Sequence, residues 1–187
     1  RGGYKVICYN RSPERTTALV AAGGDAADSI EHAVKDADVV ATMVPDSADV
    51  RDVLLSDNGV FAHARPGTLV IDFSTIRPDV TTQLARQGNQ RGLRLIDAPV
   101  SGGEQGAKNA TLSIMVGGKV EDFTAAEPIL TVLGKTIVHL GPNGAGQTVK
   151  AANQLIVAGN IELLAEAITF LQAFGVDIEA DVIPHRK

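Results

Sequence analysis

Hydrophobic positions along the chain form short runs that alternate with longer amphipathic segments. The short runs are rich in β-branched residues and predict strands at residues 5–9, 38–44, 69–73, 93–97, 112–116 and 136–139. The segments between them predict helices at residues 13–22, 47–55, 78–91 and 120–133, with a further helix from residue 29. Strands alternating with such helices favour right-handed βαβ units, so we expect an α/β fold with a doubly wound, Rossmann-type parallel sheet covered on both faces.

This pattern changes at Gly144. From there to Phe174 the chain has no proline, and the segment is longer than an average globular helix, with Gly175 as its expected C-cap. Residues 176–187 would begin another helix. We therefore expect a Rossmann-type domain over residues 1–141 and the start of an all-helical domain over residues 142–187.

The beginning of the chain is typical of the middle of a fold. Gly2 and Gly3 stand directly before the first predicted strand, as at the end of a helix. A dinucleotide-binding fold starts with a strand and a Gly-rich phosphate turn, but the motif G-x-G-x-x-G does not occur in this sequence. We expect the first strand and its turn to precede Arg1, which would leave the sheet incomplete.

In a dinucleotide-binding fold, the second strand ends with a residue that contacts the adenosine ribose. Asn10, Arg11 and Ser12 occupy that position here. An acidic residue would bind the ribose 2′-hydroxyl and repel a 2′-phosphate, whereas Asn10 is uncharged and Arg11 is positive. The pattern favours NADP over NAD. The alternative is an ordinary surface arginine after a strand.

Two later strand ends also carry candidate cofactor contacts. Ligands of open α/β sheets bind at the carboxyl ends of the strands. The residues at those ends are Met43, Val44 and Pro45 after one strand and Ser74 and Thr75 after the next. The alternative for the Ser-Thr pair is a helix cap or a turn.

A third strand end offers groups that suit an anion. Ser101, Gly102 and Gly103 follow the strand at residues 93–97 in a Gly-rich segment. A hydroxyl and exposed backbone N–H groups form a nest for a carboxylate. The alternative is a flexible surface loop.

Lys150 is the only charged residue between Asn143 and Ile161. A helix that is uncharged almost all round is usually buried, and a buried ammonium needs a reason. Asn153 follows at i+3 and can share its face. Carbonyl reduction needs a group that protonates the developing alkoxide, and a lysine side chain is protonated at neutral pH. Catalysis of the reverse oxidation would require a lowered lysine pKa. Lys150 is therefore a candidate catalytic acid; the alternative is a solvated surface lysine.

Composition limits the expected partners of this 187-residue chain. The net charge is −5 without a basic patch, so nucleic acid is not expected. No uncharged apolar run has the length of a membrane span, and the first residues show no signal-peptide pattern, so we expect a cytoplasmic protein without a membrane partner. Cys8 lies in an apolar run and is expected to be a buried hydrophobe. No metal site is expected, because the histidines lack metal-ligand spacing: His32, His63, His139 and His185.

Together these motifs resemble the β-hydroxyacid dehydrogenase family, which is related to 3-hydroxyisobutyrate and 6-phosphogluconate dehydrogenases. The resemblance covers the whole chain, through residues 10–12, 43–46, 72–75, 97–103, 115–118 and 144–153. It implies an oxidoreductase that uses NADP, or alternatively NAD. It also implies that Ser101, Gly102 and Gly103 hold the substrate carboxylate, that Lys150 is the catalytic acid, and that Asn153 orients the substrate or the lysine.

Within the family, Glu104 after Gly103 and Gln154 after Asn153 are most similar to tartronate semialdehyde (2-hydroxy-3-oxopropionate) reductases. The implied reaction is the reduction of tartronate semialdehyde to glycerate. The alternatives are a 3-hydroxyisobutyrate or succinic semialdehyde dehydrogenase, or a non-catalytic binding protein that keeps the fold. Ala110 departs from the family pattern, because members often have glycine there.

The resemblance also implies segments beyond both ends of this chain. In the family, an N-terminal Gly-rich loop binds the pyrophosphate, and later C-terminal helices complete the substrate pocket and much of the dimer interface. We therefore expect a poorly active fragment whose intact parent is a homo-oligomer acting on a small oxo or hydroxy acid.

Overall fold

The computed structural model describes residues 2–177, within a chain that divides into two compact units, residues 1–150 and residues 151–187. The expected helix at residues 176–187 lies outside the described residues except for its first two positions, which are not helical. His185 also lies outside them.

The N-terminal elements form a small parallel sheet of their own. They are β1 (Ile7–Cys8), the 3₁₀ helix η1 (Pro13–Thr16), α1 (Thr17–Ala21) and β2 (Asp25–Ala26). The strand expected at residues 5–9 is shorter than predicted, and β2 has no hydrophobic alternation by which the sequence could predict it. Cys8 is half-buried rather than buried, because its two-residue strand belongs to a sheet of only two strands. Its thiol donates to the carbonyl oxygen of Asp25 at 3.3 Å.

The central sheet contains the remaining strands. They are β3 (Val39–Thr42), β4 (Leu69–Asp72), β5 (Arg94–Asp97), β6 (Val100–Ser101), β7 (Leu112–Gly117) and β8 (Gly134–Gly141). The α/β, Rossmann-type fold predicted from the sequence is confirmed, and β3, β4 and β5 are parallel neighbours. The strand direction changes after β5. The strand β7 is antiparallel to both β5 and β6, and β8 is parallel to β7.

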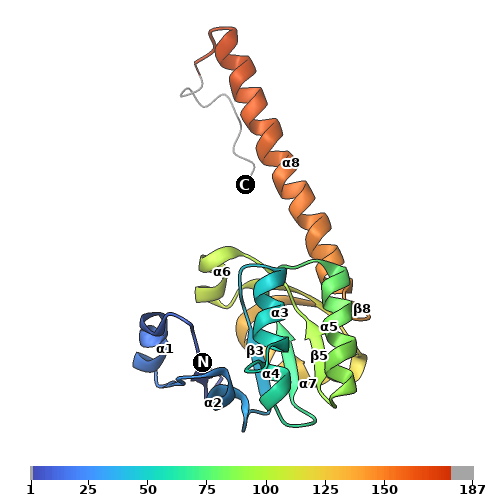
Figure 1. Ribbon diagram of the computed structural model, residues 1–187. Coiled ribbons are helices and arrows are strands. Elements are labelled where there is room, and N and C mark those ends of the chain that lie inside the picture. The colour runs from blue at the N-terminus through green and yellow to red at the C-terminus, as the bar shows by residue number, and fades with distance from the viewer. Residues whose placement is uncertain (1, 178–187) are drawn as a thin grey trace. The chain divides into compact units, whose positions relative to one another are not determined.

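The helices around this sheet are α2 (Ile30–Val34), α3 (Ser47–Leu55), α4 (Val60–His63), α5 (Pro78–Gln90), α6 (Gly103–Asn109) and α7 (Val120–Leu133). Side chains of α3, α4 and α5 pack on one face and those of α7 on the other, whereas α6 lies at one end of the sheet (Figure 1). Alternation along β4 assigns its side chains to two cores: Val70 packs in one cluster with side chains of α3, α4 and α5, whereas Leu69 and Ile71 pack in the other with α7. Figure 1 shows α3, α4 and α5 side by side on the first of these faces.

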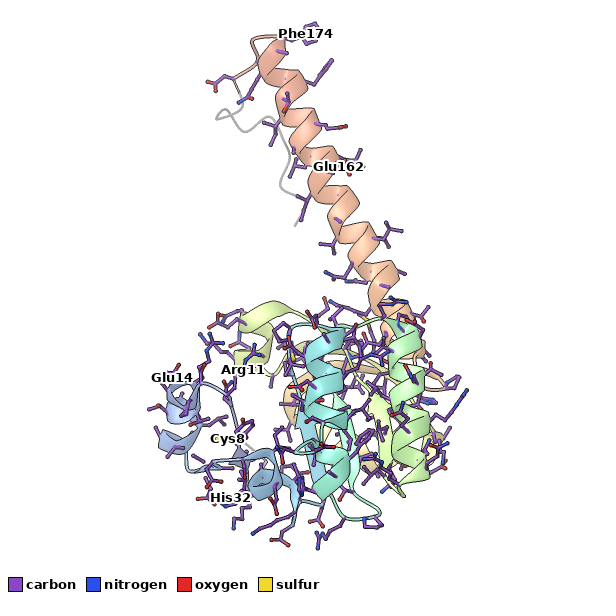
Figure 2. All side chains as sticks on the ribbon, viewed as in Figure 1. Cys8, Arg11, Glu14, His32, Glu162 and Phe174 are labelled. Carbon is purple, nitrogen blue, oxygen red and sulfur yellow. The ribbon has the colours of Figure 1, made fainter. Side chains whose placement is uncertain are left out.

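The long helix predicted after Gly144 is α8 (Ala145–Ala173). By length and composition alone, α8 could cross a membrane, with a mean hydropathy of 1.4 over its most apolar window. A single such helix is weak evidence of a span, because core helices of soluble proteins have the same length and composition. Lys150, Glu162 and Glu166 interrupt its apolar surface, and Figure 2 shows Glu162 and Phe174 along its later part.

The parallel strands end in one row. Thr42, Asp72 and Asp97 are the last residues of β3, β4 and β5, and Asp72 pairs in register with the other two. Parallel strands have their carboxyl ends at the same edge, so three polar side chains meet there. Figure 1 shows α6 at the same end of the sheet as the starts of α3 and α5.

Candidate functional site

A buried hydrogen-bond cluster joins the carboxyl ends of β3 and β4. Oδ1 of Asp72 accepts from the Thr42 hydroxyl at 2.9 Å and from the backbone N–H of Ser74 at 3.1 Å. Oγ of Ser74 then accepts from the backbone N–H of Val44 at 2.9 Å. Burial raises the pKa of the Asp72 carboxyl, although the bonds from Ser74 and Thr42 oppose this. The structure thus brings together two predicted cofactor contacts, Val44 and Ser74.

Exposed side chains flank this cluster. Met43 is 68% exposed, and Pro45 and Thr75 are exposed as well. Open α/β sheets bind nucleotides at the carboxyl ends of adjacent parallel strands, where ordered backbone meets an accessible surface. This edge therefore has the position at which open α/β sheets bind nucleotides, and the assignment of these residues to a cofactor stays a prediction.

Asn10, Arg11 and Ser12 follow β1. The carboxamide oxygen of Asn10 accepts from the backbone N–H of Ser12 at 2.9 Å, which closes a tight local turn. The Arg11 guanidinium lies 3.4 Å from a carboxylate oxygen of Asp49 on α3, and Figure 2 shows Arg11 between the N-terminal segment and α3. Because the Arg11 side chain is 78% exposed, this ion pair leaves the guanidinium accessible to a phosphate.

The segment with Ser101, Gly102 and Gly103 is ordered rather than a loop. Ser101 ends β6, Gly102 precedes α6 with φ 132°, and Gly103 starts α6 with φ 59°. Glycine is favoured at both positions, because residues other than glycine rarely adopt positive φ angles. The first N–H groups of α6 lack intrahelical acceptors, so this turn can accept a carboxylate. Among the described residues, no hydrogen bond connects this turn to Lys150.

Asp97 anchors the first turn of α8. Its two carboxylate oxygens accept from the backbone N–H groups of Gly144 at 2.8 Å and Gln147 at 3.0 Å. Asp97 is 1% exposed, and burial raises the pKa of its carboxyl against the effect of these two bonds. A buried carboxylate at a helix N-terminus is stabilised by the free N–H groups and the helix dipole, so it fixes where α8 begins.

Lys150 lies one turn further along α8 and is 7% exposed. In the part of the chain that the structure describes, its ammonium makes no hydrogen bond or ion pair. Burial lowers the pKa of Lys150 from the ordinary lysine value. Lys150 is therefore a buried lysine and not a solvated surface residue. Its lowered pKa makes its proton easier to transfer.

Asn153 belongs to the second compact unit, and its carboxamide nitrogen donates to the side chain of Gln154 at 3.1 Å. Its role stays a prediction. The residue pattern alone predicted no role for Asp72, Asp97 or Gln147, whose hydrogen bonds connect the segments of the site. A signal for the two aspartates was present, since the apolar runs Leu-Val-Ile-Asp and Leu-Ile-Asp both end in a carboxylate at the carboxyl end of a parallel strand.

Two family models match the chain. The model of the NAD binding domain of 6-phosphogluconate dehydrogenase matches residues 1–141. The model of the NAD-binding domain of NADP-dependent 3-hydroxyisobutyrate dehydrogenase matches residues 144–183.

Curated relatives are similar over most of this chain. The chain is 43% identical to the 2-hydroxy-3-oxopropionate reductase of Escherichia coli over 85% of its own length and 54% of the relative. It is 41% identical to the NAD-dependent L-serine dehydrogenase of Pseudomonas aeruginosa over 95% of its own length and 59% of the relative. The chain spans about three fifths of the length of the curated relatives that it matches first (61%, 62% and 59%).

A solved structure has the same fold. The 3-hydroxyisobutyrate dehydrogenase of Mycobacterium tuberculosis, determined with L-serine, superposes with a TM-score of 0.86 at 35% sequence identity. The match covers 95% of this chain and 60% of that one.

Proposed function

Because this chain belongs to the β-hydroxyacid dehydrogenase family related to 3-hydroxyisobutyrate dehydrogenase, we propose that it acts within an oxidoreductase for short 3-oxo and 3-hydroxy acids. The observation that carries this proposal is the buried, unpaired Lys150 at the start of α8. A site that changes the protonation of an oxygen needs a positioned proton donor, and burial lowers the pKa of Lys150, which eases transfer of its proton.

The chain's own residues provide binding and proton transfer. We propose that the turn at Ser101, Gly102 and Gly103 holds the substrate carboxylate. Lys150 donates a proton from Nζ to the carbonyl oxygen during reduction and accepts it back during oxidation, for which its lowered pKa is suited. Asn153 orients the substrate or the lysine. The bound cofactor supplies the hydride.

Both family models describe NAD-binding domains, so the cofactor is a nicotinamide dinucleotide. We propose that residues 43–45 and 74–75 contact it and that Asn10, Arg11 and Ser12 bind its adenosine ribose. The exposed guanidinium of Arg11 supports NADP rather than NAD, because it can pair with a 2′-phosphate. We propose that the domain over residues 1–141 binds the cofactor, while residues 142–187 begin the helical domain.

We propose tartronate semialdehyde as the substrate and glycerate as its product. The identity to the Escherichia coli 2-hydroxy-3-oxopropionate reductase supports this choice. The relatives that act on L-serine or 3-hydroxyisobutyrate support a second candidate within the same chemistry. All of these molecules carry a carboxylate beside a short oxygen-bearing carbon chain, so the same carboxylate turn would serve each.

We also propose that the parent protein is a cytoplasmic homo-oligomer without a membrane or nucleic-acid partner. In α8, Leu155 is 76% exposed and Ile161 and Leu163 are each 65% exposed. Such a surface needs an apolar cover. The match of residues 144–183 to a dehydrogenase domain favours a cover of protein over a lipid bilayer.

The test uses this chain and a version extended at both ends with the corresponding segments of the Escherichia coli reductase. We expect the extended version to oxidise NADPH in the presence of tartronate semialdehyde. Lys150→Met in that version should lower kcat by about 100- to 10,000-fold, because it removes the proton donor. The exposed Lys119→Met is the matched control and should retain activity.

Fluorescence titration with NADPH separates loss of chemistry from loss of binding. Lys150→Met should bind NADPH as the unaltered protein does. An extended protein that binds NADPH but reduces no short oxo acid would refute the reductase function and leave the non-catalytic binding protein in its place.

A further inference from the structure

The side chain of Gln147 is a buried polar group that neither the cofactor site nor the proton transfer uses directly. It is 1% exposed. Its carboxamide nitrogen donates to the carbonyl oxygen of Ser74 at 2.7 Å, and its carboxamide oxygen accepts from the backbone N–H of Ile76 at 3.0 Å. The amide therefore pairs with both ends of a three-residue backbone segment, residues 74–76, as a neighbouring strand would.

The backbone of Gln147 is also held, by a strand other than the one that its side chain contacts. The backbone N–H of Gln147 donates to Asp97 at the end of β5, while its side chain binds the segment that follows β4. The first turn of α8 is thus fixed to two neighbouring strand ends at once. Gly146 and Gly117 allow this close approach, because a Cβ on Gly117 would lie 2.8 Å from the backbone nitrogen of Gly146.

Net stability alone is a weak reason for a glutamine in this position. Each of its hydrogen bonds contributes little net stability because the groups must first be desolvated, although an apolar replacement would leave the Ser74 carbonyl and the Ile76 N–H unpaired. Fully satisfied buried polar groups instead specify one arrangement, since any other leaves them unpaired. The arrangement specified here is the rotation and register of α8 against residues 74–76.

Lys150 lies three residues after Gln147, on the same side of the helix. The orientation of the Lys150 side chain therefore depends on Gln147. Gln147 pairs with the backbone of residues 74–76, beside the proposed cofactor contacts. We infer that Gln147 is a positioning residue, which couples residues 74–76 of the proposed cofactor site to Lys150 and sets where the proton donor lies relative to that site. This inference rests on the proposed function.

The first test measures Lys150 without requiring turnover. Gln147→Met keeps the volume of the side chain and removes both hydrogen bonds, so circular dichroism should show a folded chain. The reaction of lysines with acetic anhydride at a series of pH values, followed by mass spectrometry, reports the protonation and accessibility of Lys150 relative to the exposed Lys35. We expect the ratio of the two rates to change by about threefold, which corresponds to half a pKa unit.

Hydrogen exchange of the Ile76 amide is the accompanying readout. It should accelerate in Gln147→Met, because its acceptor is lost, and should not change in the exposed control Gln90→Met. If the Ile76 amide exchanges faster while the Lys150 to Lys35 ratio is unchanged, the coupling does not exist and the inference is overturned. If Gln147→Met does not fold, Gln147→Asn decides by the same two readouts, because its amide remains polar but is one methylene too short to keep both hydrogen bonds.

The second test uses the extended protein. Misplacement of the proton donor should lower kcat by about a hundredfold, whereas KM for NADPH should change by less than about threefold. Equal kcat values for the extended protein with and without Gln147→Met would also overturn the inference. The proposed function fails separately, when the extended protein binds NADPH but reduces no short oxo acid, and the acetylation result on this chain does not depend on that outcome.

Discussion

Gly146 is the position at which the contact between α8 and the sheet can be tested most directly. A Cβ added there would collide with the backbone carbonyl oxygen of Met115 on β7 and would lie 2.9 Å from Oδ2 of Asp97 and 3.0 Å from the backbone nitrogen of Gly117. Two of these three neighbours are backbone atoms, which cannot move aside by changing rotamer. Gly146→Ala must therefore push the start of α8 away from β7.

The magnitude follows from three contributions. Overpacking in a well-packed region costs about 1–3 kcal/mol, and the backbone neighbours place this site in the upper half of that range. Displacement of the helix weakens the bonds to Asp97, for about 1 kcal/mol more. The higher helix propensity of alanine returns at most about 1 kcal/mol. We expect a net loss of about 2 kcal/mol in the free energy of unfolding, or a Tm lower by about 4–8 °C.

The assay is thermal unfolding followed by circular dichroism, with Gly159→Ala as the matched control. Gly159 lies in the same helix, and a Cβ there would meet nothing within 4 Å. That substitution should leave the stability unchanged or increase it by up to about 1 kcal/mol. If Gly146→Ala unfolds at the same temperature as Gly159→Ala or above it, the packing of α8 on β7 is not as close as the structure indicates.

The remaining predictions concern pH, a strained turn and cofactor choice. Burial raises the pKa of the Asp97 carboxyl, so the folded state binds more protons than the unfolded state. The contribution of Asp97 to the free energy of unfolding therefore falls as pH rises from about 4, the ordinary carboxyl pKa, through the raised value. Asp97→Asn should flatten this dependence in urea unfolding at several pH values; an unchanged slope would contradict the assignment. Ala110, with φ 55°, is the one non-glycine among the described residues with a positive φ, so Ala110→Gly should raise the free energy of unfolding by about 1 kcal/mol, and a decrease would show that the turn is not strained. Arg11→Ala in the extended protein should raise KM for NADPH about tenfold and leave KM for NADH unchanged, because one charge-assisted bond to the 2′-phosphate is lost; a parallel change in both values would exclude that contact.

The hydrophobic pattern predicted most of the elements because their side chains follow the local period of a strand or helix. Residues 69–73 alternate between two faces, and β4 indeed distributes Leu69 and Val70 to different cores. No helix was predicted at residues 103–109, which form α6. Its glycines favour a loop locally, but Gly106 packs against Leu112, and a Cβ on Gly106 would lie 3.1 Å from a methyl group of that leucine.

The sequence by itself determined that Lys150 stands alone in an uncharged helix and that polar residues follow the ends of apolar strands, since both are properties of neighbouring residues. Only the tertiary structure decided what these residues contact. Gln147 and Ile76 are 71 positions apart, and the carboxylate of Asp97 meets the N–H of Gln147 from 50 positions away. Hydrogen bonds between such distant segments depend on strand order and helix placement, which no local period encodes. The direction of the sheet after β5 was decided in the same way, by the antiparallel pairing of β6 with β7.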